Sequence, residues 1–302
     1  MRYIQIGLGL ALLVGAAGCP EGSRLNLLRP NSPVNPLPAT PPSREELVSY
    51  LNDNSANLPG VVSDDVTLTV YIGGGVGVPI GGWMRAEGPR NFRMQAKMFG
   101  NEEVDLGSNK QEFWYWIKRA DPPWQVFCSY QACEEGRAKQ MPFPFQPDWV
   151  MEAMGMGKYG PPERYERIVE KETVKLVEKT KSPQGVAVRK IIVFNLRPAT
   201  GDQPQVTDYL LVDDATGKLI CSAKIKRRQI IASRAEIPRD MELSWPDQKM
   251  KLGLTINAAK IHTQIPPQVF VRTPMRNIQS YDLATGRLEG LTQAGGPKTP
   301  IR

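Results

Sequence analysis

Phe92-Arg93-Met94-Gln95-Ala96-Lys97-Met98 is the stretch that decides the fold of this chain, because apolar and polar residues alternate along its whole length. Alternation at period two predicts a β-strand with one buried and one solvated face. Such one-sided strands are typical of antiparallel sheets, since parallel sheets are usually buried on both faces. The stretch therefore indicates an antiparallel sheet that packs one face on a core.

The same alternation recurs on both sides of this stretch. Residues 66–72 and 250–256 each place an apolar side chain at every second position, which predicts two more strands with one buried face. Turn signals separate the predicted strands, among them Gly107-Ser108-Asn109 and residues 213–217. Strands joined by short turns form hairpins, so the chain predicts a sheet built largely from sequence neighbours.

Two predicted helices interrupt the strands. Ser43 is a good helix N-cap, and Glu46 completes the sequence signature of a capping box. Residues 148–156 are apolar on one side and run into a glycine-rich stretch, which predicts a second helix and its end. We therefore expect an α+β fold, a curved antiparallel sheet with the helices packed as a lid on its concave face.

The first residues predict export. Met1-Arg2-Tyr3 is basic and residues 4–17 carry no charge, but this apolar run is shorter than the roughly 20 residues of a membrane-spanning helix. Residues 1–18 therefore read as a signal peptide. Ala16-Ala17-Gly18-Cys19 resembles the bacterial lipobox, in which a diacylglyceryl group is attached to the cysteine. Ordinary secretion is the alternative, since the small residues also suit a general signal peptidase, but we expect lipid on Cys19.

A linker should separate this anchor from the folded part. Residues 19–42 contain seven prolines and few bulky apolar side chains, so the segment cannot bury enough surface to fold by itself. An extended proline-rich chain of this length reaches roughly 70 Å. We predict one domain over residues 43–275, followed by a weakly structured tail over residues 276–302.

These features predict a location and partners. Export and lipidation favour the cell envelope, at the outer membrane or the periplasmic face rather than the cytoplasm, with the membrane as one partner. The net charge of +7 and the pI of 9.2 suit an anionic surface. Nothing in the sequence indicates a nucleic-acid partner, and we expect a monomer.

The other cysteines leave alternatives open. Cys128 and Cys133 would lie about 16 Å apart on a straight strand, whereas a disulfide tolerates about 6 Å between Cα atoms. They can pair only if residues 129–132 turn, which leaves Cys221 free; the alternative is that both remain thiols. No metal site or cofactor is expected, because His262 is the only histidine and the cysteine spacing lacks a second pair.

Single motifs give little support for a phosphate-binding site, an aromatic ligand cavity, a headgroup site or an active site. The glycine-rich residues 73–82 lack both GxGxxG and a P-loop lysine, which favours a hairpin loop over a phosphate site. The aromatic residues 113–116 suit a core strand better than a ligand cavity. Lys224, Lys226 and Arg228 occupy alternate positions, which predicts a solvated strand face rather than a headgroup site. No GxSxG elbow occurs, so we predict no catalytic residue and no enzyme.

Several short motifs together resemble a known family. They are Pro89-Arg90-Asn91-Phe92-Arg93, Asp105-Leu106-Gly107-Ser108-Asn109-Lys110, Phe113-Trp114-Tyr115-Trp116 and Asp208-Tyr209-Leu210-Leu211-Val212-Asp213 with Thr216-Gly217-Lys218-Leu219. This pattern is similar to that of the outer-membrane lipoprotein-sorting superfamily, which includes the LolA, LolB and LppX-like folds. The resemblance implies a half-open β-barrel whose helices cover an apolar cavity for acyl chains. The predicted anchor on Cys19 favours the lipid-anchored members.

The resemblance and the alternation together suggest which residues would line such a cavity. The candidates are apolar side chains on the predicted buried face of the sheet: Leu68, Val70, Phe92, Met94, Met98, Leu106, Leu252 and Leu254. Methionine suits this role because its unbranched side chain adapts to a flexible ligand. The predicted function is binding of acyl chains or lipoprotein for transport or sorting. The alternative is a structural or partner-binding lipoprotein, in which the same residues close into an ordinary core.

Overall fold

The alternating stretch around Phe92 forms strand β3 (Asn91–Met98) in the computed structural model. The structure describes residues 40–72, 75–138, 147–182, 185–232, 235–275 and 277–289. These residues belong to one unit, Pro36–Arg302. The predicted signal peptide, Cys19 and all but the end of the predicted linker lie outside the described residues, as do Gly73, Gly74 and the last part of the predicted tail.

The described residues contain fifteen strands, which form a single sheet. The strands are β1 (Gly60–Ile72), β2 (Val78–Glu87), β3, β4 (Asn101–Ser108), β5 (Glu112–Ile117), β6 (Gln125–Ser129), β7 (Tyr165–Val169), β8 (Thr173–Lys181), β9 (Ala187–Asn195), β10 (Val206–Asp213), β11 (Leu219–Ala232), β12 (Ala235–Trp245), β13 (Met250–Ile261), β14 (Ser280–Asp282) and β15 (Arg287–Glu289). Their order in the sheet is β15-β14-β6-β5-β4-β3-β2-β1-β13-β12-β11-β10-β9-β8-β7.

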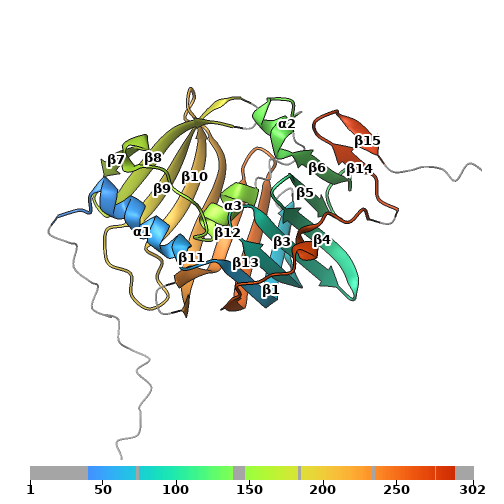
Figure 1. The fold of residues 1–302 in the computed structure, drawn as a ribbon, viewed down its shortest axis with the longest axis horizontal. Helices are drawn as coiled ribbons and strands as arrows, with labels where there is room; N and C mark the ends of the chain where they lie inside the picture. Colours follow the sequence, from blue (N-terminus) through green and yellow to red (C-terminus); the bar gives the residue numbers. More distant parts are fainter. Residues whose placement is uncertain are drawn as a thin grey trace, which may run out of the picture. The chain divides into compact units, whose positions relative to one another are not determined.

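The sheet consists of two wings that meet at one seam. β2–β6 form the first wing and β7–β12 the second, and β1 pairs antiparallel with β13 between them. Every pairing is antiparallel except that of β14 with β6, which is parallel. The sheet is curved and unclosed, with β15 and β7 at its two edges (Figure 1). The predicted curved antiparallel sheet is therefore confirmed.

Short helices pack against this sheet. They are α1 (Arg44–Ala56), α2 (Tyr130–Glu134) and α3 (Pro147–Ala153), and the chain also has two 3-10 turns, η1 (Pro162–Arg164) and η2 (Pro267–Phe270). Figure 1 shows α1 and α3 in front of the strands of the second wing, on the inner side of the curve. The predicted lid position of the helices is thus confirmed, although each helix is small.

The start of α1 is the predicted capping box. The Ser43 side chain accepts a hydrogen bond from the Glu46 backbone N–H at 3.2 Å, and the Ser43 N–H donates to Glu46 Oε2 at 2.6 Å. Leu47, Val48 and Leu51 point from this helix into the core. α1 is therefore held at its N-terminus by local hydrogen bonds and along its length by apolar packing.

The outer face of the first wing is covered by another segment of the chain, although the alternation in residues 92–98 predicts that this face is solvated. The sequence predicts Arg93 on a solvated face, but its side chain is only 7% exposed and forms a bidentate pair with Asp105 at 2.8 and 3.1 Å. Arg93 also donates to the Val271 carbonyl at 2.6 Å. The segment around η2 thus crosses the outside of β3 and β4, which explains why Trp114 is buried there too.

The sheet also extends past the predicted domain end at residue 275. Tyr281 in β14 pairs with Val126 of β6 and with Leu288 of β15. Trp124 stacks on the Tyr281 ring with centroids 5.1 Å apart. The described part of the predicted tail therefore adds two edge strands to the first wing, because an aromatic stack and backbone pairing hold it there.

Candidate functional site

The eight candidate cavity residues lie together on one face of the sheet. Strand register places Leu68 opposite Leu254, Val70 opposite Leu252, and Met94 opposite Leu106. Phe92 and Met98 belong to the same strand as Met94, and Met98 is only partly buried. The alternation in the sequence thus correctly grouped side chains that lie far apart along the chain.

In the structure these side chains pack closely. Leu68, Phe92, Met94, Leu106, Leu252 and Leu254 are each no more than 2% exposed and belong to one apolar core together with the helices. Of the eight, only Val70 borders one of five prominent hollows among the described residues, and that hollow measures about 10 Å³. A space for a ligand among the eight residues therefore remains a proposal.

Methionines are frequent in the apolar core that the helices and the sheet share. The buried methionines are Met84, Met94, Met151, Met154, Met156, Met241 and Met250. Met151 belongs to α3 and Met154 and Met156 follow it directly, while the others lie on strands. A contact built from unbranched, polarizable side chains can repack with small loss of contact energy.

A larger hollow opens between the two wings, and we call it the mouth cavity. It has a volume of about 410 Å³, within the range of about 300–1,000 Å³ that is usual for small-molecule sites. The first wing contributes Phe113, α2 contributes Tyr130 and Cys133, α3 contributes Trp149, and the end of β8 contributes Thr180 and Lys181. Four segments that are distant in sequence thus enclose it.

One ionic cluster lies in the wall of the mouth cavity and fixes α3 to the first wing. Arg90 Nε donates to Asp148 Oδ2 at 3.1 Å, and the Tyr130 hydroxyl donates to the other oxygen of this carboxylate at 3.0 Å. The Arg90 guanidinium also lies 3.9 Å from the centre of the Tyr130 ring. Burial raises the pKa of Tyr130, and the Asp148 carboxylate raises it further, so Tyr130 stays a hydrogen-bond donor.

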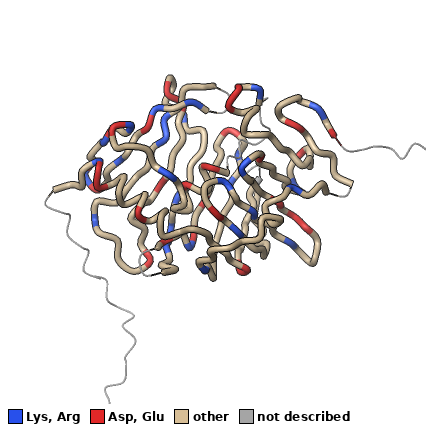
Figure 2. Tube along the Cα trace, in the orientation of Figure 1, with Lys and Arg blue, Asp and Glu red and all other residues tan. Residues whose placement is uncertain are grey.

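The opposite wall carries two lysines. Lys190 Nζ donates to Glu152 at 2.7 Å and so ties β9 to α3, whereas Lys181 is exposed at the rim. Elsewhere Lys and Arg are interspersed with Asp and Glu along the chain, as Figure 2 shows. The net positive charge is therefore spread over the domain, and the mouth cavity combines an apolar wall with a few charged groups.

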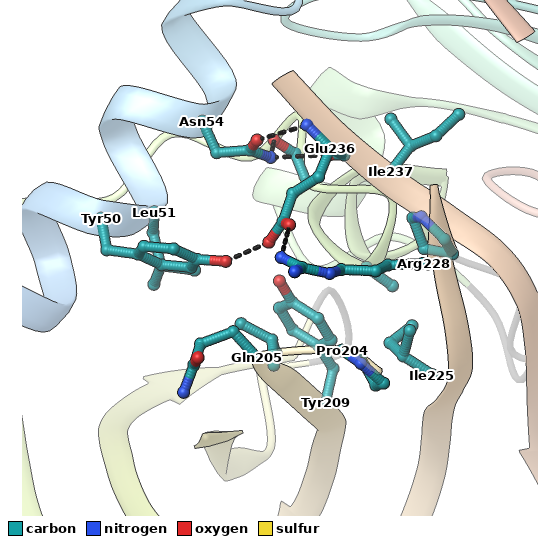
Figure 3. Close-up of a pocket in the computed structure, with 14 residues that line it drawn as sticks. Tyr50, Leu51, Asn54, Pro204, Gln205, Tyr209, Ile225, Arg228, Glu236 and Ile237 are labelled. Carbon is teal, nitrogen blue, oxygen red and sulfur yellow. Dashed lines mark hydrogen bonds and ion pairs between the residues drawn. The ribbon is translucent and has the colours of Figure 1, made fainter. Parts of the chain in front are cut away.

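A polar network holds the other end of the lid (Figure 3). The Asn54 side chain of α1 donates to the Glu236 carbonyl at 2.9 Å and accepts from the Glu236 N–H at 2.9 Å. The Glu236 carboxylate accepts from the Tyr50 hydroxyl and pairs with Arg228. Burial raises the pKa of Tyr50, and the Glu236 carboxylate adds to the effect. The space between these groups is about 40 Å³, which suits water rather than an acyl chain.

Arg228 departs from its predicted place. The sequence puts it on the solvated face with Lys224 and Lys226, and both lysines are indeed exposed. The pairing of β11 with β12 shifts between Ile225 and Arg227 and again at Arg228. Such a bulge breaks the alternation, so the Arg228 side chain turns inward and is 17% exposed.

The chain turns between the two candidate disulfide cysteines, as pairing requires. α2 begins at Tyr130, and the Ser129 side chain accepts a hydrogen bond from Ala132 N–H at its start. The Cys133 and Cys128 sulfurs lie 3.4 Å apart as thiols. Burial raises the pKa of Cys221 to about 12, and this thiol borders none of the five hollows.

Metal ligands and the single histidine are further candidates for a site among the described residues. No group of three or more His, Cys, Asp or Glu side chains among them could hold a metal ion. His262 is exposed and lies outside the five hollows.

A further hollow of about 580 Å³ lies at the ends of β1, β12 and β13, beside Trp245 and Lys249. Within the described ranges, no helix has both the length and the apolar character needed to cross a bilayer.

Comparison with known proteins gives likenesses of fold. No family model and no curated protein matches the sequence. Among solved structures, a domain described as an outer membrane lipoprotein-sorting protein from Vibrio parahaemolyticus is 7% identical, with 76% of this chain and 97% of that chain covered and a TM-score of 0.48. A DUF1329 family protein from Desulfovibrio piger is 6% identical, with coverage of 76% and 95% and a TM-score of 0.47.

A third match is a LolA superfamily protein from Nitrosomonas europaea. It is 9% identical, with 74% of this chain and 96% of that chain covered and a TM-score of 0.44.

Proposed function

We propose that the protein is a lipid-anchored lipoprotein of the bacterial envelope that takes an acyl chain, of a lipid or a lipoprotein, between its helices and the concave face of its sheet. The observation that carries this proposal is the position of the mouth cavity. Trp149 of α3 borders the cavity and also packs into the apolar core. A chain entering beside Trp149 would therefore meet apolar side chains as it advanced.

The lid is built in a way that would let it move. α3 has seven residues and α2 has five, which is too short for either helix to be stable without its contacts to the sheet. The contacts beneath α3 include Met151 and Met154, whose side chains can repack around a ligand. Each acyl CH₂ moved from water into this space would gain about 0.8 kcal/mol, so binding would need no specific polar contact.

The remaining parts of the proposal rest on the sequence. Lipid on Cys19 and a linker over residues 19–42 would hold residues 43–275 at the outer membrane or the periplasmic face. We propose a monomer that works without a cofactor. Replacing Cys19 with alanine should abolish lipidation and slow or block cleavage of residues 1–18, and the wild-type protein should enter the detergent phase in a detergent partition. Recovery of the wild-type protein in the aqueous phase would contradict the anchor.

A second candidate function has its own support. The eight candidate residues are packed without a large space between them, as expected for a structural or partner-binding lipoprotein with a filled core. The two functions differ in one measurable property, since only the first requires uptake of acyl chains.

The test is binding of a fluorescent fatty acid by the purified protein. The wild-type protein should bind it saturably, and extraction with organic solvent followed by mass spectrometry should release acyl chains from the protein as isolated. Met94→Glu should abolish binding, because it places a charge in the apolar core. Lys226→Ala is the matched control on the solvated face of β11 and should bind like the wild type.

Two readouts keep this test decisive. Circular dichroism must show that Met94→Glu is folded; if it is not, Trp149→Ala at the mouth cavity takes its place and should weaken binding. If the wild-type protein shows no saturable probe binding and releases no acyl chains, the lipid function is refuted and the filled-core alternative is favoured.

A further inference from the structure

Two thiols face each other beside the mouth cavity. Cys128 at the end of β6 and Cys133 in α2 lie with their sulfurs 3.4 Å apart. A disulfide bond needs about 2.05 Å between sulfurs, so a small rotation of the two side chains would bring them into bonding distance. Cys221, in β11, borders neither the mouth cavity nor the other four hollows named above.

The two thiols differ in access and in acidity. Cys133 borders the mouth cavity and is 6% exposed, whereas Cys128 is fully buried. Once Cys133 is ionised, the Cys128 thiol can donate a hydrogen bond to it, which holds the pKa of Cys133 below its usual value. The same interaction, with burial, raises the pKa of Cys128. Cys133 therefore combines contact with the cavity and a lowered pKa, the two properties that favour an attacking thiol.

We propose that Cys133 and Cys128 form a thiol–disulfide exchange site that opens into the mouth cavity, with Cys133 as the attacking thiol and Cys128 as the resolving thiol. The co-reactant is a disulfide, either of a small molecule or of an oxidoreductase. The Cys133 thiolate attacks one sulfur of this disulfide, forms a mixed disulfide and expels one thiolate. This site does not depend on acyl binding.

The second step closes the protein disulfide. Cys128 loses its proton to water and attacks the Cys133 sulfur, which breaks the mixed disulfide and expels the second thiolate. Both expelled thiolates take up the protons released by the protein thiols. Two protein thiols are thus oxidised to one disulfide while the co-reactant disulfide is reduced to two thiols. The new bond joins α2 to the end of β6, and so fixes one wall of the mouth cavity.

Oxidised glutathione is a suitable probe for this chemistry. The reduced full-length protein is incubated with it, the reaction is stopped with acid, and remaining thiols are alkylated before peptide mapping by mass spectrometry. The wild-type protein should lose the thiols of Cys128 and Cys133 and show one peptide link between them. Cys221→Ser, the matched control at a buried cysteine, should behave like the wild type.

The single variants test the order of the two steps. Cys128→Ser should accumulate glutathione on Cys133, because the resolving thiol is gone, while Cys133→Ser should leave Cys128 unmodified. Equal modification of Cys128 in Cys133→Ser would overturn the assigned roles. Two free thiols in the wild-type protein after the incubation would overturn the exchange site itself, and that measurement does not depend on how the variants fold.

Discussion

Asn54→Ala tests whether the lid is held by the network beneath the C-terminal half of α1. The Asn54 amide forms three hydrogen bonds to backbone groups outside its helix: two with Glu236 at 2.9 Å each and one with the Gly155 carbonyl at 3.2 Å. These bonds join α1 to β12 and to the segment after α3. Alanine at this position would break all of them.

The expected loss of stability follows from these bonds. An intramolecular hydrogen bond contributes about 0.5–1.5 kcal/mol, and Asn54 is only part-buried, so water can replace some of what is lost. Alanine also favours the helix over asparagine by about 0.5 kcal/mol. We therefore expect Asn54→Ala to lower the free energy of unfolding by about 2 kcal/mol.

Urea unfolding followed by circular dichroism measures this change, and hydrogen exchange of the α1 amides shows where it acts. Asn57→Ala is the matched control: this asparagine caps the same helix and its side chain donates only to Asp53 in α1, at 2.7 Å. The control should lose less stability and leave amide exchange in the body of α1 unchanged. If Asn54→Ala unfolded at the same urea concentration as the wild type, the network would not hold the lid.

Three further predictions concern the fold. Gly155→Ala should lower the free energy of unfolding by about 1–3 kcal/mol in urea, because Gly155 has a φ of +81° and a Cβ would lie 2.5 Å from the Asn54 amide nitrogen. Asp105→Ala should cost about 3–5 kcal/mol, since it leaves Arg93 buried without its partner; a loss below about 1 kcal/mol would mean that water reaches this arginine. Lys226→Ala should cost less than about 1 kcal/mol, because the lysine is half exposed. Its hydrogen bond holds the pKa of Glu242 below the usual value, so the pair's contribution is present above the unfolded pKa and lost as the pH falls through the folded pKa. Wild type and Lys226→Ala should thus converge in acid, and a difference that grew in acid would contradict this.

Local patterns in the sequence predicted several hairpins and the helices α1 and α3, but not α2 and not every strand. β12 escaped prediction because Pro238 interrupts its apolar pattern, and proline argues against a central strand. The structure tolerates it where the pairing of β11 with β12 shifts, opposite Arg228. The same bulge explains why the alternation misplaced Arg228. A bulge depends on how two strands fit together, which neither strand reveals alone.

The candidate site could be predicted only in part for a related reason. Alternation correctly grouped Leu68 with Leu254 and Met94 with Leu106, because side-chain direction in a strand is a local property. The burial of Arg93 could not be predicted, since Val271 in the segment that covers it follows 178 residues later in the chain. The mouth cavity was missed for the same reason, because its wall combines α2, α3 and the β8–β9 turn.

The seam between the wings sets the order in which the sheet can be completed as the chain is made. β1 has β2 as one neighbour soon after it is synthesised, but its other neighbour, β13, places Ile261 opposite Val61. Until that last long strand exists, the middle of the future sheet is an edge with unpaired N–H and C=O groups beside apolar side chains. A chain that ends before β13 would therefore expose β1 as an unpaired edge strand in the middle of the sheet. Truncated copies are therefore expected to associate with one another through this edge.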